Sequence, residues 1–163
     1  MTPDEEFAQF AEAAAERLRT TAFMLCRDWH LAQDLTQTAL TRLYLGWRRA
    51  RQADNLTAYA QKILLRAYLD HRRRRSSSET VTQVIHDAGY RHHPDLRLTM
   101  LDALGRLTAR DRAIVVLRYF EDYSVEQVAE VLDVPAGVVK TQTRRSLAKL
   151  REVLAEDQLA LFA

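Results

Sequence analysis

Apolar residues recur at steps of three and four residues along most of this chain, and this spacing limits the available folds more than any other feature. Leu31, Leu35 and Ala39 belong to one such series, and similar series run through residues 7–25 and 56–67. Each series gives an α-helix one apolar face to bury against its neighbours. Almost no stretch alternates apolar and polar residues as a strand does. The sequence therefore predicts an all-α fold.

The helical spacing is interrupted between residues 76 and 95. This stretch contains serines, threonines, Gly89 and Pro94, which favour turns and loops. We interpret it as a flexible linker between two small helical domains, residues 1–75 and 96–163, the first a three-helix bundle. Hydrophobic residues make up 47% of the 163 residues, which is enough to give each domain a core.

Capping residues mark the expected helix starts. Asn55 can accept a hydrogen bond from the free amides of the third helix. In the second domain, Thr108 followed by Asp111 resembles a capping box and predicts a helix that runs through Phe120.

The segment that begins at Ser124 has the pattern of a helix-turn-helix. Ser124 and Gln127 form a second capping-box pattern, which predicts a helix ending at Leu132. Asp133 tolerates the left-handed conformation that the turn requires, and a longer helix is expected from about residue 137 to 154. Its polar and basic residues suit phosphates and base edges in a major groove: Lys140, Thr141, Gln142, Arg144, Arg145 and Lys149.

Charge is unevenly distributed, although the net charge is only +2. Residues 62–75 contain six basic side chains and one acid, and residues 140–151 contain five basic side chains and none that is acidic. Two basic segments far apart in sequence indicate a polyanion bound at two places.

Other classes of protein are disfavoured. The chain has no long apolar run and no secretory leader, so we expect a soluble cytoplasmic protein without membrane contact. The single cysteine, Cys26, fits core packing. Adjacent His92 and His93 beside Asp95 point in different directions on any regular element, so we expect neither a metal site nor a cofactor. A metal-dependent enzyme would need clustered carboxylates or histidines, which none of the predicted helix faces carries.

Three runs of sequence together carry a resemblance to a known family. They are "HLAQDLTQTALTRLYLGW", "NLTAYAQKILLRAYLDHRRRR" and "LTARDRAIVVLRYFEDYSVEQVAEVLDVPAGVVKTQTRRSLAKLR". With these runs in order, the chain resembles bacterial sigma factors of the extracytoplasmic-function group, the small two-domain initiation subunits of RNA polymerase. It is most similar to their short actinobacterial members, over roughly residues 5–75 and 96–154.

The resemblance implies a docking site for core RNA polymerase. In the family, an Asp-Leu-x-Gln stretch of the second helix binds the clamp coiled coil of the polymerase's largest subunit, and here it corresponds to Asp34, Leu35 and Gln37. Asp34 and Gln37 share one helix face, while Leu35 turns toward the core. Thr38 stands where relatives usually have an acid, which implies a weaker contact there.

The resemblance also implies that the first domain recognises and melts the minus-ten promoter element. Exposed bases need aromatic and apolar surface, and the single-stranded backbone needs cations. The implied contacts are Trp47, Arg48, Arg49, Arg51, Asn55, Tyr59, Lys62 and Arg66, followed along the upstream duplex by Arg72, Arg73, Arg74 and Arg75. Arg66 stands where relatives commonly have asparagine, so the sequence read there is expected to differ.

The second domain is expected to read the minus-thirty-five element and to contact the flap of the polymerase's second-largest subunit. Gln142, Arg144 and Arg145 are the expected base readers, with Lys140 and Lys149 on phosphates. The resemblance thus predicts a promoter-specificity subunit without catalytic activity, associated with the nucleoid, and it leaves open whether an anti-sigma protein restrains it. A stand-alone helix-turn-helix regulator is the alternative, but it would leave the arginine-ended third helix and the face bearing Asp34 unexplained.

Overall fold

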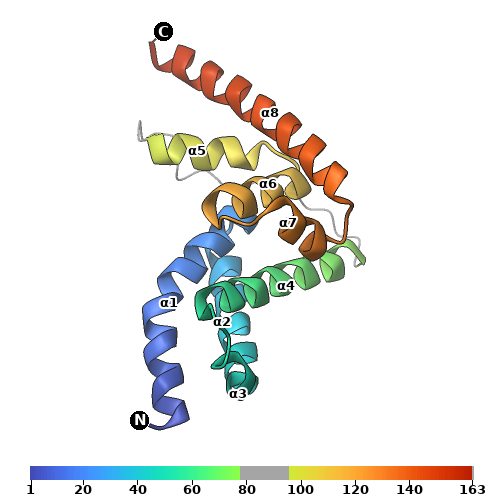
Figure 1. Ribbon diagram of the computed structural model, residues 1–163. Coiled ribbons are helices and arrows are strands. Elements are labelled where there is room, and N and C mark those ends of the chain that lie inside the picture. The colour runs from blue at the N-terminus through green and yellow to red at the C-terminus, as the bar shows by residue number, and fades with distance from the viewer. Residues whose placement is uncertain (78–95, 163) are drawn as a thin grey trace. The chain divides into compact units, whose positions relative to one another are not determined.

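The computed structural model describes the backbone of residues 1–77 and 96–162, with the side chains of residues 1–75 and 100–156 (Figure 1). The first range holds α1 (Pro3–Cys26), α2 (Trp29–Leu45), α3 (Trp47–Ala50) and α4 (Leu56–Ser77). The second holds α5 (Leu96–Gly105), α6 (Ala109–Val115), the π-helical turn η1 (Val116–Phe120), α7 (Val125–Leu132) and α8 (Ala136–Phe162). No strand occurs in these ranges, and the predicted all-α class is confirmed.

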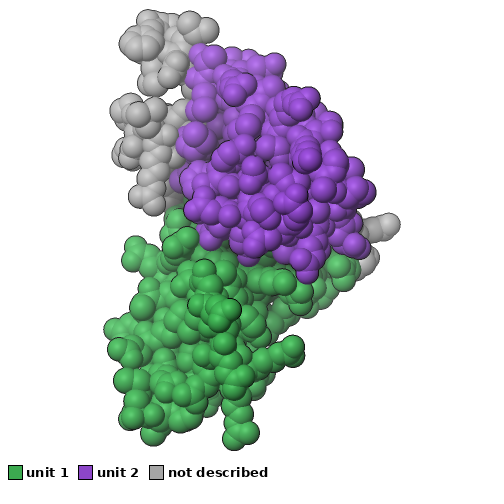
Figure 2. All heavy atoms as spheres, in the orientation of Figure 1, with its two compact units in different colours: residues 1–82 green, residues 83–163 purple. Residues whose placement is uncertain are grey.

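The chain divides into two compact units, Met1–Thr82 and Gln83–Ala163, which Figure 2 colours separately. The dividing point falls among residues 78–95, outside the described ranges. The predicted domain limits and the flexible linker therefore stay predictions.

The N-terminal unit packs α1, α2 and α4 around one apolar core. Leu18, Leu25, Leu43, Leu64 and Leu65 are among its fully buried side chains. Leu18, Leu25 and Leu43 lie on the apolar stripes that the sequence spacing defines. On α4 the buried side runs through Leu64 and Leu65, whereas Tyr59 and Ile63, which the spacing predicts to face the core, are half-buried. Each helix turns its polar side to solvent. The unit thus presents the polar surfaces of α2 and α4 on a fixed scaffold.

Local hydrogen bonds set the helix starts of this unit. The Asn55 side chain accepts from the Ala58 amide at 3.0 Å, as predicted. Thr2 and Glu5 form a capping box at the start of α1, which the sequence analysis missed although the Thr-x-x-Glu pattern was present. Asp28 caps α2 by accepting from the amides of His30 and Leu31.

The C-terminal unit contains the predicted helix-turn-helix. Ser124 and Gln127 form the capping box that starts α7, and Asp133 ends it in a left-handed conformation with φ 56°. Val128 and Val139 are fully buried on the facing sides of α7 and α8. The sequence therefore predicted the turn chemistry that sets α8 across α7.

Three details differ from the sequence predictions. The helix expected through Phe120 is α-helical only to Val115, because η1 follows it with a Glu121 amide to Val116 carbonyl hydrogen bond of the π type. The last helix was expected to end at Leu154 but extends to Phe162. Between the second and third predicted helices, residues Trp47–Ala50 form the single turn of α3, which the spacing did not predict.

Within the described residues, none of the helices combines the length and hydropathy needed to span a membrane. The same residues hold no group of three or more His, Cys, Asp or Glu side chains arranged to bind a metal ion. His92, His93 and Asp95 lie outside them.

Candidate nucleic-acid and polymerase interfaces

The middle of α2 presents the predicted docking residues as the sequence suggested. Asp34 and Gln37 are exposed on the same side of the helix, while Leu35 is 4% exposed in the core. The buried hydroxyl of Thr36 donates to the Ala32 carbonyl at 2.8 Å, so it leaves no polar group of its own unpaired in the core. This arrangement leaves a carboxylate and an amide, about one turn apart, free to meet a partner helix.

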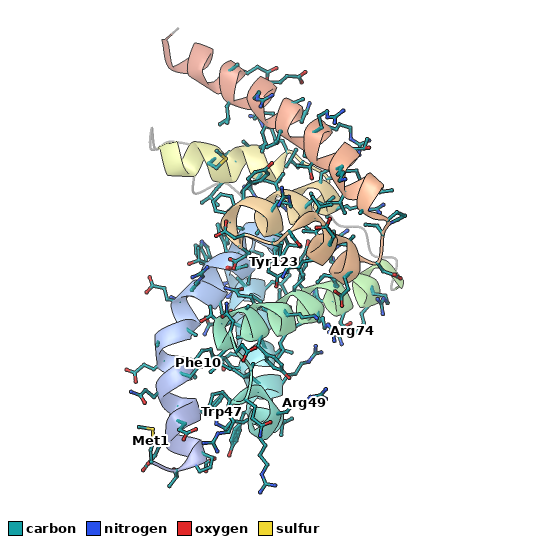
Figure 3. The ribbon with its side chains drawn as sticks, in the orientation of Figure 1. Met1, Phe10, Trp47, Arg49, Arg74 and Tyr123 are labelled. Carbon is teal, nitrogen blue, oxygen red and sulfur yellow. The ribbon has the colours of Figure 1, made fainter. Side chains whose placement is uncertain are left out.

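Trp47 does not lie on the surface that the sequence analysis expected it to share with the neighbouring arginines. It is only 7% exposed, and its ring contacts those of Phe7 and Phe10, at centroid distances of 5.4 and 6.0 Å. Figure 3 shows Phe10 and Trp47 between α1 and α3. The interpretation of Trp47 as a surface for bases is therefore revised, because its ring is buried where α3 packs against α1.

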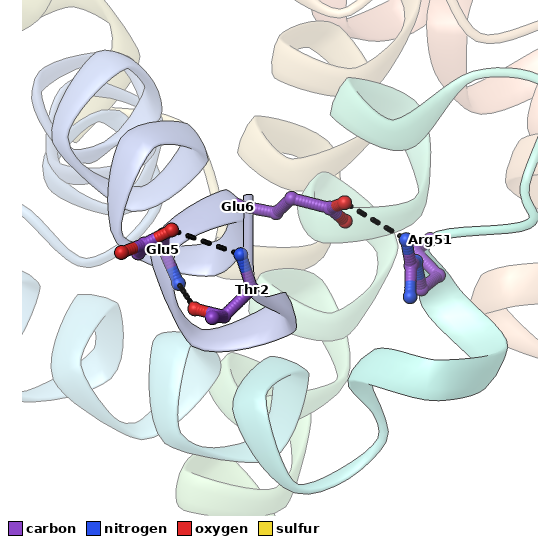
Figure 4. Close-up of polar contacts among 4 residues, drawn as sticks. All are labelled: Thr2, Glu5, Glu6 and Arg51. Carbon is purple, nitrogen blue, oxygen red and sulfur yellow. Dashed lines mark hydrogen bonds and ion pairs between the residues drawn. The ribbon is translucent and has the colours of Figure 1, made fainter.

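Arg51 follows α3 and is held by the first turn of α1. Its Nη2 lies 2.8 Å from Glu6 Oε1, beside the Thr2–Glu5 capping box (Figure 4). A second contact joins the first turn of α1 to the end of α2, since the Tyr44 hydroxyl donates to Asp4 Oδ1 at 3.1 Å. That hydrogen bond to the carboxylate raises the pKa of Tyr44. Neither pair could be found from local sequence spacing, because about 40 residues separate the partners.

The other predicted residues of this region lie on the surface. Arg48, Arg49 and Asn55 are exposed, although the Asn55 side-chain oxygen is already engaged in capping α4. Figure 3 places Arg49 on the outer side of α3. The predicted contacts on α3 that remain exposed, Arg48 and Arg49, are therefore cations.

One side of α4 collects the remaining predicted contacts. Tyr59, Lys62 and Arg66 follow one another at steps of three and four residues, and Arg73 continues the same side two turns later. Tyr59 and Lys62 are half-buried, whereas Arg66 and the four arginines of residues 72–75 are exposed.

The electrostatics of α4 are strongly positive toward its C-terminal end. Asp70, the one acid of residues 62–75, pairs with Arg42 of α2 at 3.2 Å. Partial burial, followed by the charges of Arg74, Arg75 and Arg72, lowers the pKa of His71, although Asp34 acts in the opposite direction. Cations at this end also interact favourably with the helix dipole.

The exposed side of α8 has one row of residues along its middle, of which all but Arg144 are small, and cations at both edges. Gly137, Thr141, Arg144 and Ala148 succeed one another at steps of four, three and four residues, and all are exposed. Helical geometry places Lys140 and Arg151 along one edge and Arg145 and Lys149 along the other. A helix shaped in this way can enter a groove while its edges meet the flanking phosphates.

Two of the three expected base readers are not free on this side. The Gln142 side-chain oxygen is buried and has no hydrogen-bond partner within the described structure. Arg145 Nη2 lies 3.5 Å from Asp111 Oδ1 of α6, with side chains 64% and 11% exposed. That contact is an ion pair without hydrogen-bond geometry. Of the expected readers, Arg144 alone stands in the middle of the open side, and Gly137 and Ala148 are neighbours that the sequence analysis did not single out.

Two helical units, one of which carries a helix-turn-helix with a basic second helix, define a DNA-binding protein. Comparison with known sequences gives the family. Residues 10–78 match the family described as Sigma-70 region 2, and residues 103–152 match Sigma-70, region 4.

Individual relatives span almost the whole chain. The RNA polymerase sigma-E factor of Streptomyces avermitilis is 34% identical over 94% of this chain and 88% of its own length. The ECF RNA polymerase sigma factor SigW of Bacillus subtilis is 21% identical over 93% of this chain and 90% of its own length. In fold, the chain is similar to the sigma factor RpoE of Bartonella quintana, solved with the anti-sigma factor NepR, at a TM-score of 0.72, 23% identity and coverage of 93% and 98% of the two chains.

The chain belongs to the sigma factors of bacterial RNA polymerase, in the extracytoplasmic-function group. It is therefore a promoter-specificity subunit that binds core RNA polymerase and promoter DNA, and not a stand-alone regulator. Sigma factors are not a family of enzymes.

Proposed function

We propose that the two units divide the work of promoter opening. The N-terminal domain, predicted as residues 1–75, docks on the clamp coiled coil of the largest polymerase subunit through Asp34 and Gln37. Its α3–α4 surface then binds the minus-ten element and holds it open. The C-terminal domain, predicted as residues 96–163, reads the minus-thirty-five element with α8 and contacts the flap of the second-largest subunit.

The observation that carries this proposal is the exposure of basic side chains on α4 and α8. Arg66 and the arginines of residues 72–75 are exposed on one unit, and Lys140, Arg144 and Lys149 on the other. Each group stands on a helix whose opposite side is buried in an apolar core. Because their helices are fixed in a packed core, these cations can meet phosphates without first ordering the backbone.

Within the minus-ten surface, bases and backbone fall to different residues. Tyr59 offers the aromatic face on which an unpaired base can stack, and Lys62 and Arg66 lie beside it on the same side of α4. Arg48, Arg49 and Arg51 follow the single-stranded backbone, while Asn55 has only its amide N–H groups left to donate. Trp47 holds this surface in place, because its buried ring packs α3 against α1.

Within α8, the open middle of the helix reads bases and the edges bind phosphates. Thr141 and Arg144 are the proposed readers, and Lys140 and Lys149 neutralise phosphates on either side. Arg145, paired with Asp111, belongs to the phosphate edge rather than to the reading side. Gln142, whose side-chain oxygen is buried, is not among the proposed readers.

Two further proposals concern how the chain is regulated and where it acts. The Bartonella quintana relative was solved with an anti-sigma factor, and we propose that a protein of that class also restrains this chain. We further propose that the chain acts in the cytoplasm at the nucleoid and has no catalytic activity of its own.

Transcription on two templates tests the division of work. Core polymerase with the full-length chain is supplied either with a duplex promoter or with the same promoter carrying a mismatched, pre-opened minus-ten region. Tyr59→Ala should start few RNA chains on the duplex and recover on the pre-opened template, because melting is no longer required. Arg144→Ala should be defective on both. Equal defects of Tyr59→Ala on both templates would contradict the proposal.

A further inference from the structure

Gly137 has no conformational reason to be glycine. It is the second residue of α8 and is exposed. No glycine within the described ranges has positive φ, and a Cβ built on Gly137 would meet nothing within 4 Å. The left-handed turn just before it, where glycine would relieve strain, instead carries Asp133 at φ 56°. The fold would therefore accept the Cβ of an alanine at residue 137.

Alanine at this position would leave the stability of the fold unchanged or raise it. Glycine is among the weakest helix formers because the unfolded chain has more freedom to lose, and alanine is the strongest. This glycine relieves no strain or clash within its own unit. What favours it is therefore a partner that binds at this point of the surface. The neighbours of Gly137 indicate what that reason is.

Gly137 is the first residue of the row along the middle of the open side of α8. Thr141 lies one turn further along the same side, and Lys140 and Arg144 stand beside it. The start of a recognition helix is the part that reaches deepest toward base edges. A missing side chain at that point lets the helix backbone approach the bases more closely than any other residue would permit.

We propose that Gly137 is a specificity-determining residue for duplex DNA. Its missing side chain gives the start of α8 room to seat against a base pair in the major groove of the minus-thirty-five element. The inference rests on the proposed function, because it assumes that α8 reads this element. A side chain at residue 137 lifts the helix start away from the bases, and the contacts of Thr141 and Arg144 weaken with it.

The test compares stability with recognition in the same variant. Gly137→Ala is assembled with core polymerase, and the holoenzyme is titrated with a promoter fragment and with a fragment in which the minus-thirty-five element is scrambled. We expect the unfolding temperature of the variant chain to be unchanged or up to about 4 °C higher. We expect the preference for the intact element to fall about tenfold or more, and Gly137→Leu to abolish it.

A matched control separates the position from the added bulk. Ala155→Leu enlarges another small exposed residue of α8, about 27 Å further along the helix axis, and should leave the preference unchanged. If Gly137→Ala keeps the wild-type preference, or if Ala155→Leu loses as much, the proposal is overturned.

Arg144→Ala separates the role of Gly137 from the proposed reading of the minus-thirty-five element by α8. If Arg144→Ala loses the preference and Gly137→Ala does not, the inference about Gly137 fails and the proposed function stands. If neither variant changes the preference, reading by α8 fails, and the role of Gly137 fails with it.

Discussion

Removing the carboxylate of Glu6 should strengthen the binding of single-stranded minus-ten DNA. Glu6 holds Arg51 at 2.8 Å, with the two side chains 30% and 41% exposed. A partly exposed pair of this kind contributes about 0.2–1 kcal/mol. A phosphate that takes Arg51 must first displace the carboxylate, so Glu6→Gln should raise affinity about 1.4- to 5-fold.

The salt dependence gives an independent measure of the same exchange. One additional free cation increases the steepness of the plot of log affinity against log salt by about 0.7 for a single strand. The assay is fluorescence anisotropy of a labelled nontemplate-strand oligonucleotide titrated with holoenzyme at several salt concentrations. Glu6→Gln should therefore show both tighter binding and a steeper plot.

Two controls make this prediction specific. Glu12 is exposed on the same helix and has no polar partner among the described residues, so Glu12→Gln removes one charge without releasing an arginine and should have a smaller effect. In an Arg51→Ala background, Glu6→Gln should add no more than Glu12→Gln does. Weaker binding by Glu6→Gln, or an undiminished gain without Arg51, would refute the reasoning.

Further expectations concern stability. Trp47→Ala should lower the free energy of unfolding of the N-terminal unit by about 3–5 kcal/mol, measured by denaturant titration, because the large cavity cannot be refilled; a loss below 1 kcal/mol would mean that the aromatic cluster is not packed. Asp133→Gly should raise the free energy of unfolding of the C-terminal unit by up to about 1 kcal/mol, since glycine is unstrained at φ 56°. A decrease in this free energy would count against strain at that turn. The pKa of His71 is lower in the folded chain than in the unfolded chain, so as the pH falls the unfolded chain takes up this proton first. The stability of the N-terminal unit is therefore full above about pH 6.5 and declines as the pH falls below it. His71→Ala should flatten this decline, and an unchanged pH profile would exclude His71 as its cause.

The fold was largely predictable because its determinants are local. The spacing of Leu31, Leu35 and Ala39 defines the buried side of α2 without reference to any other segment. Ser124 and Gln127 form the capping box that starts α7, three residues apart, as expected. Periodicity and capping are both properties of a few consecutive turns, which is why they can be read from one sequence.

The contacts that decide which side chains are free were not predictable in this way. The Glu6–Arg51 and Asp111–Arg145 pairs join residues far apart in the chain. The burial of Trp47 depends on phenylalanines of α1, which are far from it in the sequence. An aromatic residue beside arginines therefore has the sequence pattern of a surface residue. Sequence patterns thus indicated where the basic surfaces lie, while tertiary packing determined which of their members can meet a partner.

The most direct test of the account is initiation by core polymerase with and without this chain. Purified core enzyme is mixed with the full-length protein and a library of genomic fragments from the same organism, and the 5′ ends of the RNA products are sequenced. We expect the chain to co-elute with core enzyme and to produce a limited set of start sites that core enzyme alone does not use. If the chain fails to co-elute and adds no start site, its role as a promoter-specificity subunit is contradicted.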